Sequence, residues 1–96
     1  MAYGIVHYFE GGTAEQYQNT VAVVHPDGGA TLPAGQTYHA AGVTPDGFVV
    51  VAIWDSEDDY VKFRDESLLP GFASVENALP GPPDETTFEV HRTQSS

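Results

Sequence analysis

Three histidines, His7, His39 and His91, fall on segments whose side chains alternate as they do in β-strands. Imidazole has a reference pKa of about 6.5, so it can take or give a proton near neutral pH without a large change in its surroundings. Such a group could remove the acidic proton of a phenol or of an enolisable ketone. We therefore predict acid–base chemistry with His39 as the base and with His7 and His91 in support. The alternative for each histidine is a structural role in the sheet or in an interface.

A few polar groups in an otherwise apolar cavity are typical of a small-molecule site. Beside the histidines, a hydroxyl or an indole N–H could donate a hydrogen bond to the enolate that forms when the proton leaves. The residues that we expect to bind the ligand are Trp54, Tyr8, Tyr38, Phe9, Val50 and Glu89. The sequence thus predicts a site for a small apolar or aromatic molecule.

The residue pattern argues against a metal site. Three histidines with Glu89 could ligate zinc, iron or copper, but they come from separate strands and show no local spacing signature. The chain has no cysteine, so no thiolate site can form. The acidic run 57–59 lacks the spaced ligands and the central glycine of a calcium loop. We predict no metal and no other cofactor.

The stretch 37–55 is predicted to be a β-hairpin around which the other elements are arranged. Its turn is Thr44-Pro45-Asp46-Gly47, in which proline and glycine suit the tight backbone conformation. Residues 48–54 form an apolar run that needs a cover on both faces of the sheet. Ser56 follows as a helix cap, with acidic residues in the first turn.

The remaining elements complete a β-α-β-β-α-β order. Strands are expected at 3–9 and 86–93, and helices at 13–24 and 56–69. The second helix is expected to be interrupted at Pro70-Gly71 and followed by a short helical piece at 72–79. The glycine- and proline-rich segment 25–36 is expected to be a loop at the site's entrance. This order predicts a ferredoxin-like α+β fold in one domain, 1–96, with an antiparallel sheet of order 4-1-3-2.

Strand alternation divides the predicted sheet into two faces. We expect Val6, Phe88 and Val90 to pack under the helices, which would place the predicted histidines on the opposite face. His39 joins that face only in one hairpin register, because a slip of one residue would turn it toward the helices. The opposite face would also carry four large apolar residues, namely Phe9, Phe48, Val50 and Trp54. A second copy of the chain is the expected cover for it, which predicts a homodimer with the site between the sheet and its cover.

Three stretches of the sequence resemble a known superfamily. They are GIVHYFEGGTAEQYQ, HAAGVTPDGFVVVAIWDSEDDYVKFRDESLLP and PGPPDETTFEVHR, and together they cover nearly the whole chain. They resemble the dimeric α+β barrel superfamily, and within it small bacterial proteins related to antibiotic-biosynthesis monooxygenases. The most specific parts are the strand that begins at His39 and the Trp54-Asp55-Ser56 junction.

The resemblance implies that two sheets pack face to face as a barrel. It also implies an enzyme of the cofactor-independent monooxygenase, isomerase or cyclase type that acts on an aromatic or polyketide-like compound. The alternative is a barrel that binds a small ligand without turning it over. Haem-degrading members place a histidine on the second helix, and residues 56–69 contain none, which argues against haem degradation here.

The charge balance excludes two classes of partner. Fourteen acidic residues against three basic ones give a net charge of −11, which repels nucleic-acid phosphates and anionic membranes. No apolar run approaches the roughly 20 residues that span a bilayer. The chain does not open with a basic segment followed by an apolar one, so a cytoplasmic location is expected.

Overall fold

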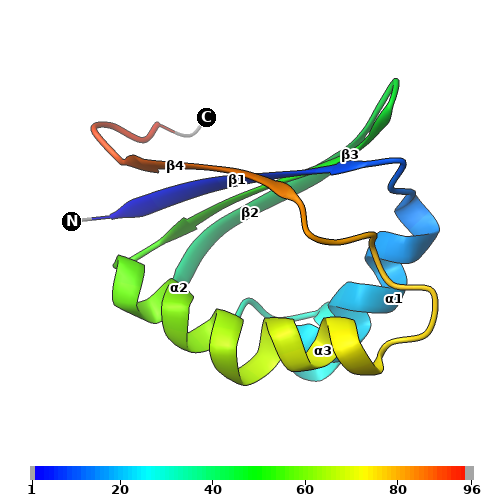
Figure 1. Cartoon of the computed structure of the whole chain (residues 1–96). Coiled ribbons are helices and arrows are strands. Elements are labelled where there is room, and N and C mark those ends of the chain that lie inside the picture. The colour runs from blue at the N-terminus through cyan, green and yellow to red at the C-terminus, as the bar shows by residue number, and fades with distance from the viewer. Residues whose placement is uncertain (1, 95–96) are drawn as a thin grey trace.

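A computed structural model describes residues 2–94 and shows a sheet covered by helices on one face (Figure 1). The strands are β1 (Tyr3–Glu10), β2 (Gln36–Thr44), β3 (Gly47–Trp54) and β4 (Asp84–Glu89). They form one antiparallel sheet of order β2-β3-β1-β4, which confirms the predicted ferredoxin-like topology. The helices are α1 (Ala14–Val24), α2 (Glu57–Phe63) and α3 (Leu69–Ser74). A short 3₁₀ turn, η1 (Pro26–Gly29), follows α1 in the expected loop.

Helix α1 begins and packs as its sequence predicts. The Thr13 hydroxyl accepts a hydrogen bond from the Gln16 N–H, and the Gln16 side chain accepts one from the Thr13 N–H. This capping box satisfies two backbone donors that have no partner within the helix. Val21 and Val24 are buried against the rest of the molecule, as the apolar stripe of the helix requires.

The second helical segment does not break at Pro70, contrary to the prediction. A proline lacks an N–H and its ring clashes with the carbonyl four residues earlier. The clash is avoided by a π-helical turn, η2 (Arg64–Leu68), in which the Leu69 N–H donates to the Arg64 carbonyl five residues back. The helical path therefore runs through Pro70 into α3 and ends at Ser74, so most of the predicted helical piece 72–79 is not helical.

The helices cover the face that we expected a second copy to cover. Ile5, His7 and Phe9 of β1 are buried on the helix side, together with Phe48 and Trp54 of β3. The prediction of the faces was therefore inverted. Both faces of β1 and β3 are rich in apolar residues, so alternation separates the two sets but does not say which set meets the helices.

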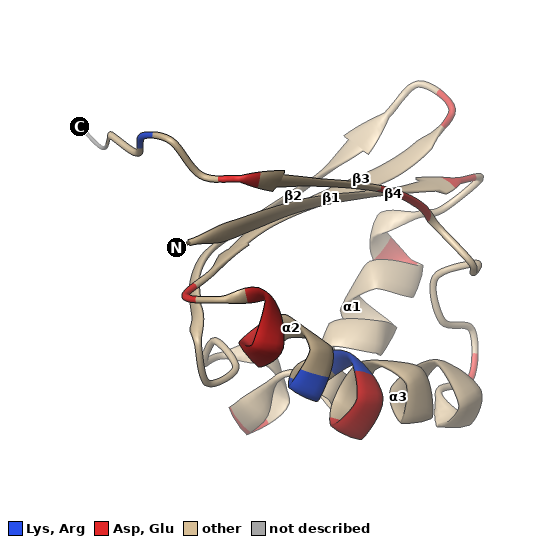
Figure 2. Cartoon of the chain, turned by 60° about the vertical axis from the view of Figure 1, so that its left-hand side comes forward, with Lys and Arg blue, Asp and Glu red and all other residues tan. Residues whose placement is uncertain are grey.

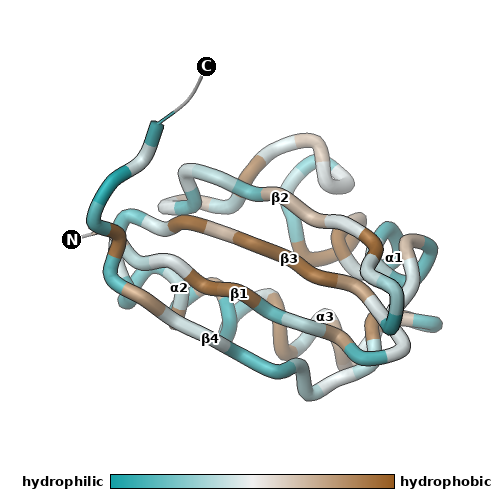
Figure 3. The backbone as a smooth tube through the Cα atoms, turned by 90° about the horizontal axis from the view of Figure 1, so that it is seen from above, coloured by the Kyte–Doolittle hydropathy of each residue, from teal (hydrophilic) through white to brown (hydrophobic). Residues whose placement is uncertain are grey.

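The opposite side of the sheet, which we call the outer face, has no cover within residues 2–94. Its central residues, all half-buried, are Val6, Tyr8, Val49, Val51 and Ile53. Figure 3 looks onto this side and shows the hydrophobic runs of β1 and β3 in the middle of the sheet. In Figure 2 the middle of the sheet carries no charged residue, and acidic residues lie on the helices, loops and strand ends.

Strand β4 is also turned over relative to the prediction. Phe88 is 44% exposed and lies on the outer face over Gly4, at a place that a side chain on Gly4 would occupy. Its neighbours in alternation, including Glu85, therefore point toward the helices. The strand ends at Glu89, so Val90 lies beyond it. An edge strand of mixed polarity carries a weak pattern, which explains the error.

Two groups of buried residues form the core between the layers. One contains Ile5, Ala52, Trp54 and Tyr60, and the other contains Phe9, Phe48 and Leu79. Within the described residues, no helix is both long enough and apolar enough to cross a membrane.

Candidate functional site

A cavity of about 260 Å³ lies between the sheet and the helices. Its wall is mostly apolar, and its polar groups lie in two clusters that come from different elements. From the sheet it is lined by Ile5, His7, Phe9, His39, Val50 and Trp54. From the helices and the segments beside them it is lined by Tyr17, Val21, His25, Tyr60, Phe63 and Phe72. Its volume lies just below the common range of ligand pockets, so it suits a small molecule.

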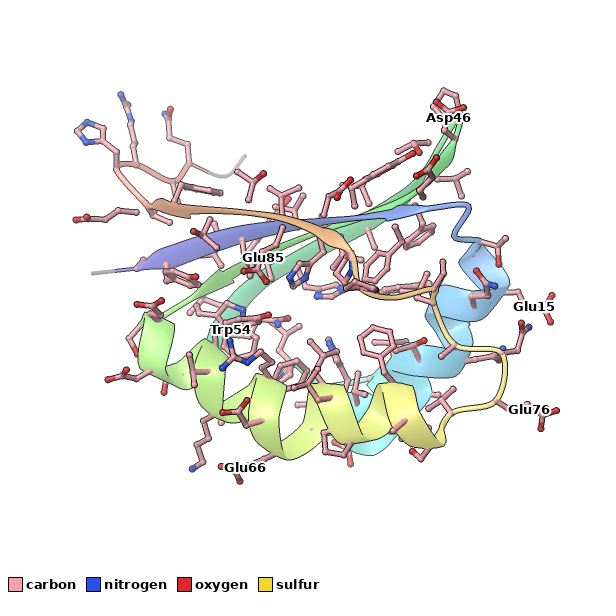
Figure 4. All side chains as sticks on the ribbon, in the orientation of Figure 1. Glu15, Asp46, Trp54, Glu66, Glu76 and Glu85 are labelled. Atoms are coloured by element: carbon pink, nitrogen blue, oxygen red, sulfur yellow. The ribbon has the colours of Figure 1, made fainter. Side chains whose placement is uncertain are left out.

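The first polar cluster pairs a histidine with a carboxylate. His7 of β1 lies opposite Glu85 of β4 in the strand register, and the His7 Nε2–H donates to Glu85 Oε2 at 2.8 Å. The Tyr60 hydroxyl of α2 donates to the same carboxylate oxygen at 3.4 Å. Burial raises the pKa of Tyr60, and the Glu85 charge raises it further, so this hydroxyl keeps its proton. Figure 4 shows Glu85 on the helix side of the sheet.

The second polar cluster contains a histidine whose two ring nitrogens are both engaged. The His39 Nδ1–H donates to Gln36 Oε1 at 3.1 Å, and His39 Nε2 accepts from the Tyr17 hydroxyl at 2.6 Å. Burial lowers the pKa of His39 and raises that of Tyr17, so both side chains stay neutral near pH 7. Gln36 sets the tautomer of His39, which in turn holds the Tyr17 proton.

His25, the residue that caps the C-terminal end of α1, stands beside this cluster. Its ring meets the His39 ring edge to face, with 4.9 Å between the ring centroids, and packs against Phe63. Only 8% of the residue is exposed, and burial followed by the His39 charge lowers its pKa to about 4. His25 is therefore a neutral imidazole at pH 7.

The indole of Trp54 supplies a donor that has no acceptor among residues 2–94. The residue is 1% exposed and its Nε1–H is fully enclosed. Figure 4 shows Trp54 between the sheet and the helix layer. A buried N–H without a partner costs about 1–3 kcal/mol.

The structure brings together five of the nine residues predicted for the site. The five that line the cavity are His7, His39, Phe9, Val50 and Trp54. Tyr8 lies on the outer face, and Tyr38 is 51% exposed there as the neighbour of Ile53 in the register. Glu89 and His91 are exposed at and beyond the end of β4, so the expected approach of His91 to His7 is wrong. The register explains the error, because Glu85 pairs with His7 and His91 lies six positions further along the chain, beyond the end of β4.

Sequence reasoning missed seven polar residues of the cavity. They are Tyr17, Thr20, His25, Gln36, Tyr60, Arg64 and Glu85. Tyr17 and Tyr60 lie on helices, where an aromatic residue usually belongs to the core, although a buried tyrosine hydroxyl usually needs a partner. His25 was assigned to the loop, although it follows the last apolar position of α1 directly. Glu85 was missed because the last strand was predicted to begin at residue 86, whereas β4 begins at Asp84. Among residues 2–94 no cluster of three or more histidines or acidic residues is arranged to hold a metal ion.

Comparison with known proteins identifies the fold. No family model matches the sequence, and no curated protein matches it. Solved structures do match over almost the whole chain, and one of them is described as a putative antibiotic biosynthesis monooxygenase, the kind of protein that the sequence resembles. The chain therefore shares the α+β ferredoxin-like fold of these structures.

Three of these structures are similar at low sequence identity. Rv0793 from Mycobacterium tuberculosis matches with a TM-score of 0.68 and 15% identity, over 99% of this chain and 100% of its own. A putative antibiotic biosynthesis monooxygenase from Chloroflexus aurantiacus matches with a TM-score of 0.64 and 17% identity, over 99% and 98%. A mutant of SnoaB, a cofactor-independent oxygenase from Streptomyces nogalater, matches with a TM-score of 0.63 and 12% identity, over 99% and 97%.

Proposed function

We propose that the protein is a small-molecule enzyme of the cofactor-independent monooxygenase, isomerase or cyclase type. Its substrate is an aromatic or polyketide-like compound held in the cavity between sheet and helices. The observation that carries this proposal is the His7–Glu85 pair in the wall of an apolar cavity. The similarity in fold to a cofactor-independent oxygenase supports the general type of chemistry.

The proposed base is His7, in place of His39. The Nε2–H of His7 is committed to Glu85, so the lone pair is on Nδ1, which has no partner among the described residues. The carboxylate fixes this tautomer and stabilises the imidazolium that forms when His7 takes a proton. Both nitrogens of His39 are already engaged, and no carboxylate faces it to stabilise a positive charge. His39 and Tyr17 are therefore assigned to ligand binding.

Proton removal leaves a negative charge on the substrate, and we assign Trp54, which lines the cavity, to stabilise it. The Nε1–H of Trp54 is a donor without a partner, and a shift of the indole ring on ligand binding would bring it from its enclosed position to the substrate oxygen. Such a donor stabilises an enolate or phenolate oxygen more than it stabilises the neutral group. In an oxygenase, the resulting carbanion reacts with dioxygen, whereas in an isomerase or cyclase it is reprotonated or attacks a carbonyl of the same molecule.

The proposal is tested by oxygen uptake and product analysis with a panel of hydroxylated naphthalenes and anthrones, without added cofactor. We expect turnover by the wild type and a loss of about 10²- to 10⁴-fold in kcat for His7→Asn. His91→Asn is the matched control, because His91 is exposed and distant from the cavity. Binding without turnover across the panel would contradict the enzyme and favour a binding protein.

We also propose a homodimer that is formed through the outer face. A chain of net charge −11 can meet a second copy most readily through an uncharged surface, and the middle of the outer face has no charged residue. Five half-buried apolar or aromatic residues on two adjacent strands supply the contact area, as is typical of a self-complementary interface. In this arrangement the cavity remains within each copy, under its own helices.

A further inference from the structure

His25 lines the cavity beside His39, in the polar cluster that does not contain the His7–Glu85 pair. Its ring lines the cavity and is held on two sides by the rings of His39 and Phe63. Neither ring nitrogen has a hydrogen-bond partner among residues 2–94, and neither is fully enclosed, so both are open to a group that enters the cavity. Polar groups of this kind in an apolar cavity wall fix the orientation of a bound ligand.

The chemistry of that group follows from the protonation state of His25. Because its pKa is lowered to about 4, the ring is neutral at pH 7 and has one N–H donor and one acceptor nitrogen. A carboxylate would match only the donor, and an ammonium would match only the acceptor. A charged group would pair with a charged residue of the cavity wall, a carboxylate with Arg64 and an ammonium with Glu85, in preference to a neutral ring. An uncharged hydroxyl can donate or accept, so it fits His25 in either tautomer.

The sheet register sets the distance between the two polar clusters. His7 pairs with Val50 of β3, and His39 pairs with Ala52 from the other side of β3. The Cα atoms of His7 and His39 are therefore two strand spacings apart across the sheet and two residues apart along it. Together these offsets give a separation of roughly 12 Å. His25 stands edge-on to His39, with 4.9 Å between the ring centroids, so a ligand that contacts both His7 and His25 has to bridge two separate polar clusters.

We propose that His25 is a specificity residue that binds a neutral hydroxyl group of the ligand, remote from the atom at which His7 acts. The ligand is then an uncharged, roughly two-ring aromatic compound with oxygen functions at opposite ends. This inference rests on the proposed small-molecule site, and it adds a residue and a chemical requirement that the catalytic proposal does not contain. His39, fixed by Gln36 and Tyr17, holds the His25 ring in place.

The test compares two probes, 2-naphthol and 2,6-dihydroxynaphthalene, which differ by one hydroxyl. Trp54 is the only tryptophan, so the single indole N–H resonance of the protein reports occupancy of the cavity in NMR titrations. We expect the wild type to bind the dihydroxy probe about tenfold more tightly, since one buried hydrogen bond is worth about 1.4 kcal/mol at most. His25→Phe should abolish this preference and keep the affinity for 2-naphthol, and His25→Gln should retain part of it.

His91→Phe is the control for a histidine outside the cavity, and it should bind as the wild type does. An equal preference in the wild type and in His25→Phe would overturn the inference, as would failure of both probes to bind the wild type. If His25→Phe does not fold, the ring ¹⁵N shifts of His25 in the wild type decide the matter. One nitrogen should shift on saturation with the dihydroxy probe, and no shift would refute the contact.

The two proposals fail in different ways. A His25-dependent preference without any turnover would leave the hydroxyl site standing and would contradict the enzyme. Suppose instead that turnover depends on His7 and that the preference for the dihydroxy probe does not change in His25→Phe. That result would support the enzyme and would contradict the hydroxyl site at His25.

Discussion

Acidification should destabilise the folded protein through His25, and the size of the effect follows from its environment. In the unfolded chain this imidazole takes a proton below its ordinary pKa of 6.5. In the folded protein, burial and the neighbouring His39 lower the pKa to about 4. Between these two values the unfolded state binds more protons, so the free energy of unfolding falls as the pH falls. The stability is fully present above pH 6.5 and is lost on the way down to pH 4.

The magnitude at pH 5 is obtained from the two pKa values. This pH lies roughly 1.5 units below the unfolded pKa, and each unit corresponds to about 1.4 kcal/mol, so the loss relative to pH 7 is about 2 kcal/mol. The buried position of His25, which is 8% exposed, limits screening by solvent. The pKa of His39 is lowered in the same direction by burial, so its protonation adds to the loss.

The assay is urea unfolding at pH 7 and at pH 5, followed by the fluorescence of the single tryptophan. The wild type is compared with His25→Gln, which keeps a polar side chain but does not titrate. Protonation of the many carboxylates changes both proteins alike, so the difference between their pH dependences isolates the imidazole. The wild type should lose about 2 kcal/mol more than the variant between the two pH values. Equal losses would refute the assignment of His25 as a buried neutral imidazole.

Three further predictions concern the catalytic pair, the two faces of the sheet and the first helix. Glu85→Gln should lower kcat about 10- to 100-fold and shift the pH profile, because the imidazolium of His7 loses its carboxylate; an unchanged profile would contradict the pairing. Val51→Asp on the outer face should give a folded monomer in sedimentation, whereas Trp54→Ala in the core should lower the free energy of unfolding by about 3–5 kcal/mol. If Val51→Asp unfolds the protein and Trp54→Ala only separates the two copies, the helices cover the other face, as the sequence predicted. Thr13→Ala should lower the unfolding free energy by about 1 kcal/mol in urea titrations, and no change would mean that the capping box contributes nothing.

Local signals in the sequence were sufficient for the elements and their order. The capping hydroxyls Thr13 and Ser56 precede their helices, and the turn at Pro45 and Asp46 joins two strands. These signals act over a few residues, so they can be recognised without the fold. The exception was Pro70. Its effect on the helix depends on whether the preceding turn widens into a π-helical turn, and the residue types in that turn do not predict the widening.

Long-range pairing decided the composition of the site. His7 and Glu85 are 78 positions apart, and Tyr17 and His39 are 22 apart, so no spacing rule relates them. The alternation of β1 grouped His7 with Phe9 correctly, but both faces of the strand are apolar enough to be covered. Which face meets the helices is settled by how large side chains such as Trp54 pack against α2, and that is a property of the whole core.

The sequence by itself determined a β-α-β-β-α-β chain, the antiparallel sheet order and the set of side chains that share a strand face with His7, because these follow from local propensity and a period of two. Only the tertiary structure decided that this face lies under the helices, that Glu85 reaches His7, and that the His25 ring lines the cavity beside His39. The physical reason is that hydrogen bonds and packing between distant segments depend on relative positions in space, and a linear pattern does not contain those positions.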